Sequence, residues 1–280
     1  RPAFERLEGR ALLAAVSWDG GGGDTLWSNP LNWSGDAVPA ASDDVTINVP
    51  ASQRWINVDV GPIWVRSLTL DDTLIINAGA ALTVSGVFTL SQNAELRING
   101  TLNWVSGVWD TDRFARIQPG GRLNIGSALN PDVGGVTLRS ELDNRGTLAW
   151  RGGTINLSST GTIVNNLGKR FEIASPASLQ PEVGSVGMVV NHGVMRRGGS
   201  EQTSTLIDVD LENSQTGLIT LLRGTLTLGD DRDGFQRAMT NAGRFFVAGG
   251  ELSVANDMMH SGATFGGGAI TFWNGWQWIE

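Results

Sequence analysis

The chain has 280 residues, a formal net charge of −8 and no cysteine, and it contains 38 glycines and 40% hydrophobic residues. The acidic balance argues against a nucleic-acid partner, because a polyanionic backbone needs a basic face, and it also disfavours uronic-acid polymers. The absence of cysteine excludes thiol catalysis and cysteine-bound metals, but it does not exclude export, since a long repeat with a continuous core needs no disulfides.

Residues 1–16 are interpreted as a leader or linker segment. The apolar run at residues 11–16 is too short for the core of a signal peptide. No stretch of the chain approaches the roughly 20 apolar residues of a membrane span, so none is expected. Residues 4–14, which read FERLEGRALLA, resemble the short leader motif of large exported proteins in planctomycete bacteria, with Gly9 where that motif usually has Pro or Asp. The resemblance implies export to the cell surface.

A Trp-rich segment follows at residues 17–44. Its order of residues resembles the opening segment of bacterial autotransporter-like passenger proteins of the filamentous-haemagglutinin-like type, as seen in Trp18, Trp27, Asn32, Trp33, Pro39, Asp43 and Asp44. In those proteins the segment precedes a parallel β-helix. The first coil of a solenoid has an open edge that invites aggregation. We therefore expect residues 17–44 to cap the N-terminal end of a solenoid.

The three tryptophans of this segment have a second interpretation. Exposed tryptophan stacks on sugar rings, but it is also a frequent packing residue at the ends of structural elements. Trp18, Trp27 and Trp33 are thus either the core of the cap, which we expect, or the stacking platform of a glycan-binding module.

Residues 45–280 are predicted to form the solenoid itself. A phrase of Asn, Gly and alternating apolar residues returns at a mean step of roughly 23 residues, which marks a repeat architecture. Its landmarks are Asn77, Asn99, Asn144, Asn165, Asn191, Asn213 and Asn241, with a weaker one at Asn124. A coil of this length holds two or three strands of about five residues. The fold class predicted is all-β, a right-handed parallel β-helix, since parallel crossovers are nearly always right-handed.

Segments such as residues 225–228 (Thr-Leu-Thr-Leu) alternate as strands with one buried face do. Asn and Gly at the corners tolerate positive φ, which tight turns need. If equivalent asparagines stack from coil to coil, their amides bond along the axis; alternatively each makes only a local turn. The aromatic residues 271–278 either close the far end of the stack or belong to a further repeat, and the similar phrase around Trp104 and Trp109 favours a repeat.

An enzyme is the main competing interpretation, because parallel β-helices host polysaccharide lyases and hydrolases, and such hydrolases use paired carboxylates. Asp208 and Asp210 would lie on one face of a strand. No histidine accompanies them, and solvated turn acids are the simpler account. The same account is preferred for Asp71-Asp72 and for the acids around Asp230. The spacing around Asp230 fails the calcium-loop pattern, which leaves a weak surface calcium site there as the alternative.

No other motif indicates chemistry. The chain has two histidines, His192 and His260, which fit no zinc spacing, and its glycine clusters lack the strand-to-helix context of phosphate binding. No cofactor and no metal are expected. The sequence favours a non-catalytic extracellular scaffold, stalk or adhesin-like segment of a larger bacterial surface protein, with surface glycans or other cell-surface proteins as partners. The alternatives are a carbohydrate-active enzyme and a glycan-binding module.

Overall fold

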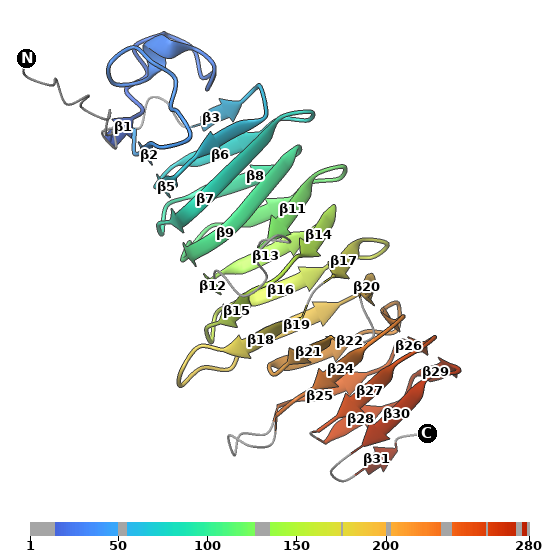
Figure 1. The fold of residues 1–280 in the computed structure, drawn as a ribbon. Coiled ribbons are helices and arrows are strands. Elements are labelled where there is room, and N and C mark those ends of the chain that lie inside the picture. Colours follow the sequence, from blue (N-terminus) through green and yellow to red (C-terminus); the bar gives the residue numbers. More distant parts are fainter. Residues whose placement is uncertain are drawn as a thin grey trace, which may run out of the picture.

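The computed structural model describes residues 15–49, 55–126, 135–174, 176–199, 203–230, 237–255, 257–272 and 276–278. These residues form an elongated stack of coils, with the blue N-terminal elements at one end and the red C-terminal strands at the other (Figure 1). Apart from one short 3-10 helix, η1 (Pro30–Asn32), the regular structure described consists of strands. This confirms the all-β solenoid predicted from the repeat.

The coils have three faces, and the strand pairings between the described parts of successive coils are parallel. One isolated antiparallel bridge lies within the N-terminal cap. Face 1 is built from β1 (Ala15–Ser17), β2 (Asp44–Ile47), β5 (Ser67–Leu70), the second half of β7 (Ala81–Leu90), the second half of β9 (Thr101–Trp109), β12 (Gly135–Leu138), β15 (Thr154–Leu157), β18 (Ala177–Pro181), β21 (Ser204–Ile207), β24 (Thr225–Leu228), β27 (Glu251–Val254) and β30 (Ala269–Phe272).

Face 2 follows face 1 along the chain and is an 11-stranded sheet. Its strands are β3 (Trp55–Val58), β6 (Thr73–Ile76), β8 (Glu95–Ile98), β10 (Ala115–Ile117), β13 (Glu141–Asn144), β16 (Thr162–Asn165), β19 (Met188–Asn191), β22 (Asp210–Asn213), β25 (Met239–Asn241), β28 (Met258–His260) and β31 (Trp276–Trp278). The mean step between their first residues is about 22, close to the 23 expected. Since β31 pairs in register with β28, residues 276–278 of the aromatic C-terminal segment form a repeat strand.

Face 3 completes each coil. It holds β4 (Ile63–Val65), the first halves of β7 and β9, β11 (Arg122–Ile125), β14 (Thr147–Trp150), β17 (Arg170–Ile173), β20 (Val194–Arg197), β23 (Leu218–Leu221), β26 (Arg244–Val247) and β29 (Ala263–Gly266). The two long strands β7 and β9 run through the corner between faces 3 and 1, so these faces count as one 20-stranded sheet.

Strand periodicity explains the core. In β24, Leu226 and Leu228 are buried while Thr225 and Thr227 are half-buried, because successive side chains point to opposite sides of a strand. The inward side chains of all coils form one continuous cluster from Val16 to Met258. Large aromatic rings are part of this core, and Trp104 stacks on Trp109 with ring centroids 3.7 Å apart. The coils therefore share one core along the whole described stack.

The N-terminal segment packs against the first coil. Trp18, Trp27 and Trp33 are all buried, and Trp33 meets the other two rings edge-on at centroid distances of 5.0 and 4.6 Å. The backbone N–H of Trp27 donates to the Asn57 carbonyl oxygen (2.8 Å), which joins the segment to β3. With no ring face left exposed, this packing supports the cap over the glycan-stacking platform. Residues 15 and 16, assigned to the leader by sequence, belong to β1; residues 1–14 lie outside the described residues.

A ladder of buried asparagines runs along the corner after face 2. The amide Nδ2 of each donates to Oδ1 of the next, at 2.8, 2.7, 2.7 and 2.5 Å, through Asn144, Asn165, Asn191, Asn213 and Asn241. The stacked arrangement is thus confirmed over five coils. Three of the predicted landmarks do not take part: Asn77 and Asn99 lie one residue beyond the register, where Ile76 and Ile98 occupy it, and Asn124 lies on face 3 beside Asn103.

The ladder asparagines do not adopt the positive φ that we expected at the corners. Among the described residues only one non-glycine, Asp36, has positive φ (53°), so the ladder asparagines are not left-handed. The glycines that follow them are needed for close approach between coils. A Cβ at Gly193 would lie 2.4 Å from the Asn166 carbonyl oxygen, and one at Gly217 would lie 2.4 Å from the Asn191 carbonyl oxygen. Both contacts are impossible for a side chain.

His260 ends the ladder and makes it sensitive to pH. Asn241 uses its Oδ1 to accept from Asn213, so its amide donates to His260 Nδ1 (2.7 Å), which must be unprotonated. Burial lowers the pKa of His260 below its usual value. As pH falls, His260 is therefore protonated in the unfolded chain at a higher pH than in the folded chain. The free energy of unfolding is thus highest above about pH 6.5 and decreases below it.

We expect the free energy of unfolding to fall between pH 7.5 and 5.5 as His260 is protonated in the unfolded state. Urea unfolding at the two pH values measures the loss. The matched variant is His260→Asn, which keeps a hydrogen-bond acceptor at the end of the ladder without a titrating ring. It should remove part of the difference, and an unchanged difference would contradict this assignment.

Candidate binding groove

The structure separates the two acids that the sequence paired. Asp208 lies in the corner between β21 and β22, whereas Asp210 begins β22, so they do not share one face of a strand. The buried Arg237 donates hydrogen bonds to both carboxylate oxygens of Asp208, with Nε–Oδ1 at 3.0 Å and Nη2–Oδ2 at 3.1 Å. Asp210 Oδ1 accepts from the Ala238 N–H (2.7 Å). The charge of Asp208 is thus compensated by Arg237 in a buried ion pair that joins the corner after β21 to the segment before β25.

The other candidate residues also have structural partners. His192 lies at the corner after β19, where its Nδ1 is 2.9 Å from Ser214 Oγ of the next coil. The acidic run after Asp230 falls on residues 231–236, which lie outside the described residues. In the part of the chain that the structure describes, no three His, Asp or Glu side chains come together as a metal site would require.

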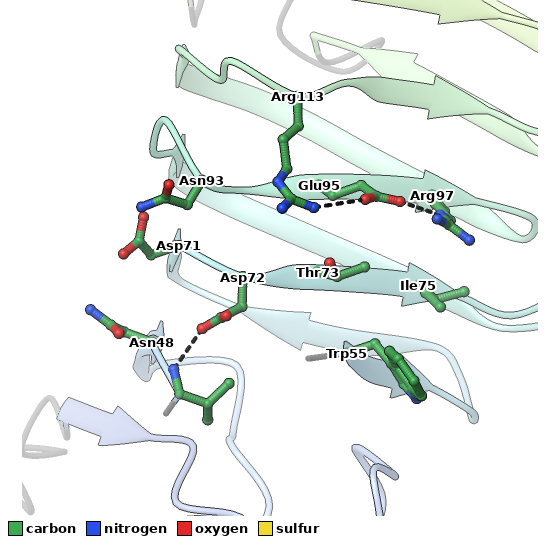
Figure 2. Close-up of a pocket in the computed structure, with 11 residues that line it drawn as sticks. Asn48, Trp55, Asp71, Asp72, Thr73, Ile75, Asn93, Glu95, Arg97 and Arg113 are labelled. Carbon is green, nitrogen blue, oxygen red and sulfur yellow. Dashed lines mark hydrogen bonds and ion pairs between the residues drawn. The ribbon is translucent and has the colours of Figure 1, made fainter. Parts of the chain in front are cut away.

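A groove of about 760 Å³ lies on face 2 near the N-terminal end (Figure 2). Its floor comes from the outward side chains of β3, β6 and β8. Register places Trp55, Thr73 and Glu95 in one row across three coils, while Ile56, Leu74 and Leu96 of the same strands point inward. Ile75 and Arg97 belong to the neighbouring outward row.

The rim comes from the corners between faces 1 and 2. Asn48, Asp71, Asp72 and Asn93 follow strands of face 1 in three successive coils, and Arg113 lies in the corner of the next. Figure 2 shows the Arg113 side chain extending toward Glu95. Because every coil turns this corner at the same place, polar turn residues from four coils gather along one edge.

Both arginines of the groove, Arg97 and Arg113, pair with the carboxylate of Glu95. Glu95 is buried and forms ion pairs with Arg97 and with Arg113, the latter at 3.4 Å. A buried carboxylate held between two guanidinium groups orients those groups along the floor. It is not a free base for paired-carboxylate hydrolysis.

Two further carboxylates carry no such partner. Within the described ranges, neither Asp71 nor Asp72 is joined to a basic side chain by an ion pair. Asp72 Oδ2 accepts from the Val49 N–H at 2.6 Å. Burial raises the pKa of Asp72 above its usual value, the charge of Asp71 adds to this rise, and the Val49 bond opposes it. Both side chains are half-buried and face the groove.

Trp55 is the large apolar group of the groove, and its side chain is 52% exposed. Sequence reasoning did not single it out, nor the row it begins. The signal that existed was the period-2 alternation that points residue 55 outward. Relating it to Thr73 and Glu95 requires the register of coils separated by unequal steps of 18 and 22 residues, which no regular repeat supplies.

No family model, curated protein or solved structure matches this chain. What the structure shows is a repeat protein built as a parallel β-solenoid. In its described part, no helix has the length and hydropathy needed to cross a membrane.

Proposed function

We propose that this chain is a non-catalytic, extracellular scaffold, stalk or adhesin-like segment of a larger bacterial surface protein. The observation that carries the proposal is the pairing of every coil with the next on three faces. A rod built in this way resists bending, because a bend must stretch hydrogen bonds on at least one face. With about 4.8 Å between neighbouring strands, the 11 strands of face 2 span roughly 50 Å.

Two further features support this assignment. The asparagine ladder adds a fourth line of hydrogen bonds along the axis, inside the core. The acids of the competing enzyme hypothesis, Asp208 and Asp210, are engaged with Arg237 and with a backbone N–H. Extracellular placement rests on the resemblances at residues 4–14 and 17–44, and it remains part of the proposal.

The proposal is tested on cells and on the purified protein. Antibodies against the rod are expected to label intact cells of the producing bacterium, and the purified chain is expected to release no sugars from a panel of plant and bacterial polysaccharides. Labelling that appears only after lysis would contradict the surface location. Release of reducing ends or unsaturated uronic acids would contradict the non-catalytic role.

A further inference from the structure

The groove on face 2 combines an exposed ring with hydrogen-bonding groups of both kinds. We propose that it binds a neutral, hydroxyl-rich glycan, with one sugar ring lying on Trp55 and hydroxyls bonded by the acids and amides of the rim. This gives a ligand to the adhesin-like form of the proposed function and rests on that function for its biological setting.

Trp55 is placed to stack on a sugar ring. An indole that is half exposed at the edge of a concave site offers an apolar surface to the C–H face of a sugar, and Ile75 lies beside it in the groove. The chain contains a natural comparison in Trp64 of β4, which is 53% exposed on face 3. Trp64 is as exposed as Trp55 but does not line this groove. The two tryptophans therefore differ in their place relative to the groove and not in their exposure.

Hydrogen-bond donors and acceptors are mixed around the indole ring. Asp71 and Asp72 accept hydrogen bonds, and the exposed amides of Asn48 and Asn93 both donate and accept. Arg113, whose side chain is 58% exposed, retains N–H groups beyond its contact with Glu95. Sugar hydroxyls are at once donors and acceptors, so they satisfy all of these groups. A purely apolar ligand would leave them unpaired.

The charge of the groove disfavours acidic sugars. Three carboxylates (Asp71, Asp72 and Glu95) and two guanidinium groups (Arg97 and Arg113) line the groove, so its formal charge is −1. Both guanidinium groups pair with Glu95, and the carboxylates of Asp71 and Asp72 have no ion-pair partner among the described residues. The chain as a whole carries −8. Bringing a uronate or sulfate beside these two carboxylates adds like-charge repulsion. A neutral glycan meets no such penalty.

The test is calorimetric titration of the purified 280-residue chain with hexasaccharides. The neutral set consists of hexamers of glucose, mannose, xylose and N-acetylglucosamine, and the charged controls are hexagalacturonate and the glucosamine hexamer. At least one neutral hexamer is expected to bind. Trp55→Ala should weaken that binding about tenfold or more, as loss of a central aromatic contact does. Trp64→Ala should leave it within about twofold, as a surface change elsewhere does.

A second variant tests the polar rim. Replacing Asp71 and Asp72 together by Ala is expected to weaken binding of the same hexamer, with the melting temperature measured for every variant to show that the rod is folded. Equal losses in the Trp55 and Trp64 variants, binding only of a charged hexamer, or no binding by any neutral hexamer would each overturn the inference. Cleavage of a bound hexamer would instead contradict the non-catalytic proposal and leave the binding site standing.

Discussion

Trp33→Ala is expected to lower the free energy of unfolding by about 3–5 kcal/mol, the usual cost of truncating a buried tryptophan. Trp33 has no exposed surface and lies between Trp18 and Trp27. Its Nε1–H also donates to the Trp27 carbonyl oxygen at 2.8 Å. Removing the ring therefore opens a cavity at the centre of the cap and leaves a buried carbonyl without its partner.

Thermal melting and urea unfolding measure this effect, and Trp64→Ala is the matched control. Because Trp64 is 53% exposed, its removal should change the free energy of unfolding by no more than about 0.5 kcal/mol. The cap covers the first coil, so the Trp33 variant should also aggregate more readily as the end of the stack becomes exposed. An unchanged melting temperature for Trp33→Ala would show that the cap does not stabilise the solenoid.

Asn191→Ala is expected to destabilise the protein by about 3 kcal/mol. Asn191 stands at the middle of the ladder, where it accepts from Asn165 and donates to Asn213, each at 2.7 Å. In the variant, the Asn165 amide keeps only a 3.5 Å contact to the Lys169 carbonyl oxygen. Asn213 Oδ1 loses the hydrogen bond that it accepts from Asn191. Each buried polar group left without a partner costs about 1–3 kcal/mol.

Asn77→Ala is the control for the ladder. Asn77 lies at the same corner but one residue out of register, is half-buried, and sits beside Ile76, which occupies the stacked position. Its truncation should cost no more than about 0.5 kcal/mol in urea unfolding. Similar losses for the two variants would mean that the corner asparagines act as local turn residues and that the stacked amides add nothing.

The alternation of single strands was readable from sequence because it depends on neighbours in the chain. Leu226 and Leu228 point inward and Thr225 and Thr227 outward in any strand that has one buried face. The recurrence of Asn and Gly in turn fixed the coil length to within about a residue of the observed step. Strand alternation and recurring corner residues both depend on short stretches of sequence, so corner insertions of unequal length do not remove them.

The sequence also nominated Asp208 with Asp210, and here local spacing misled. Two residues that are two positions apart in a strand lie on the same face of it. Asp208, however, lies in the corner before β22 and not in the strand. Its partner is Arg237, 29 residues away. The identity of the ladder members had the same difficulty. Asn77 and Asn144 look equivalent in the sequence, and only the register of β6 and β13 tells them apart.

By itself, then, the sequence determined that this chain winds as a β-solenoid with an aromatic segment before the first coil, since period, turn residues and buried alternation are properties of contiguous stretches. Tertiary structure alone decided which residues of successive coils become neighbours. That decision creates the asparagine ladder, the Asp208–Arg237 pair and the groove of Trp55, Asp71 and Asp72. The physical reason is that parallel pairing joins residues about 20 positions apart, and insertions of unequal length at the corners shift which ones meet.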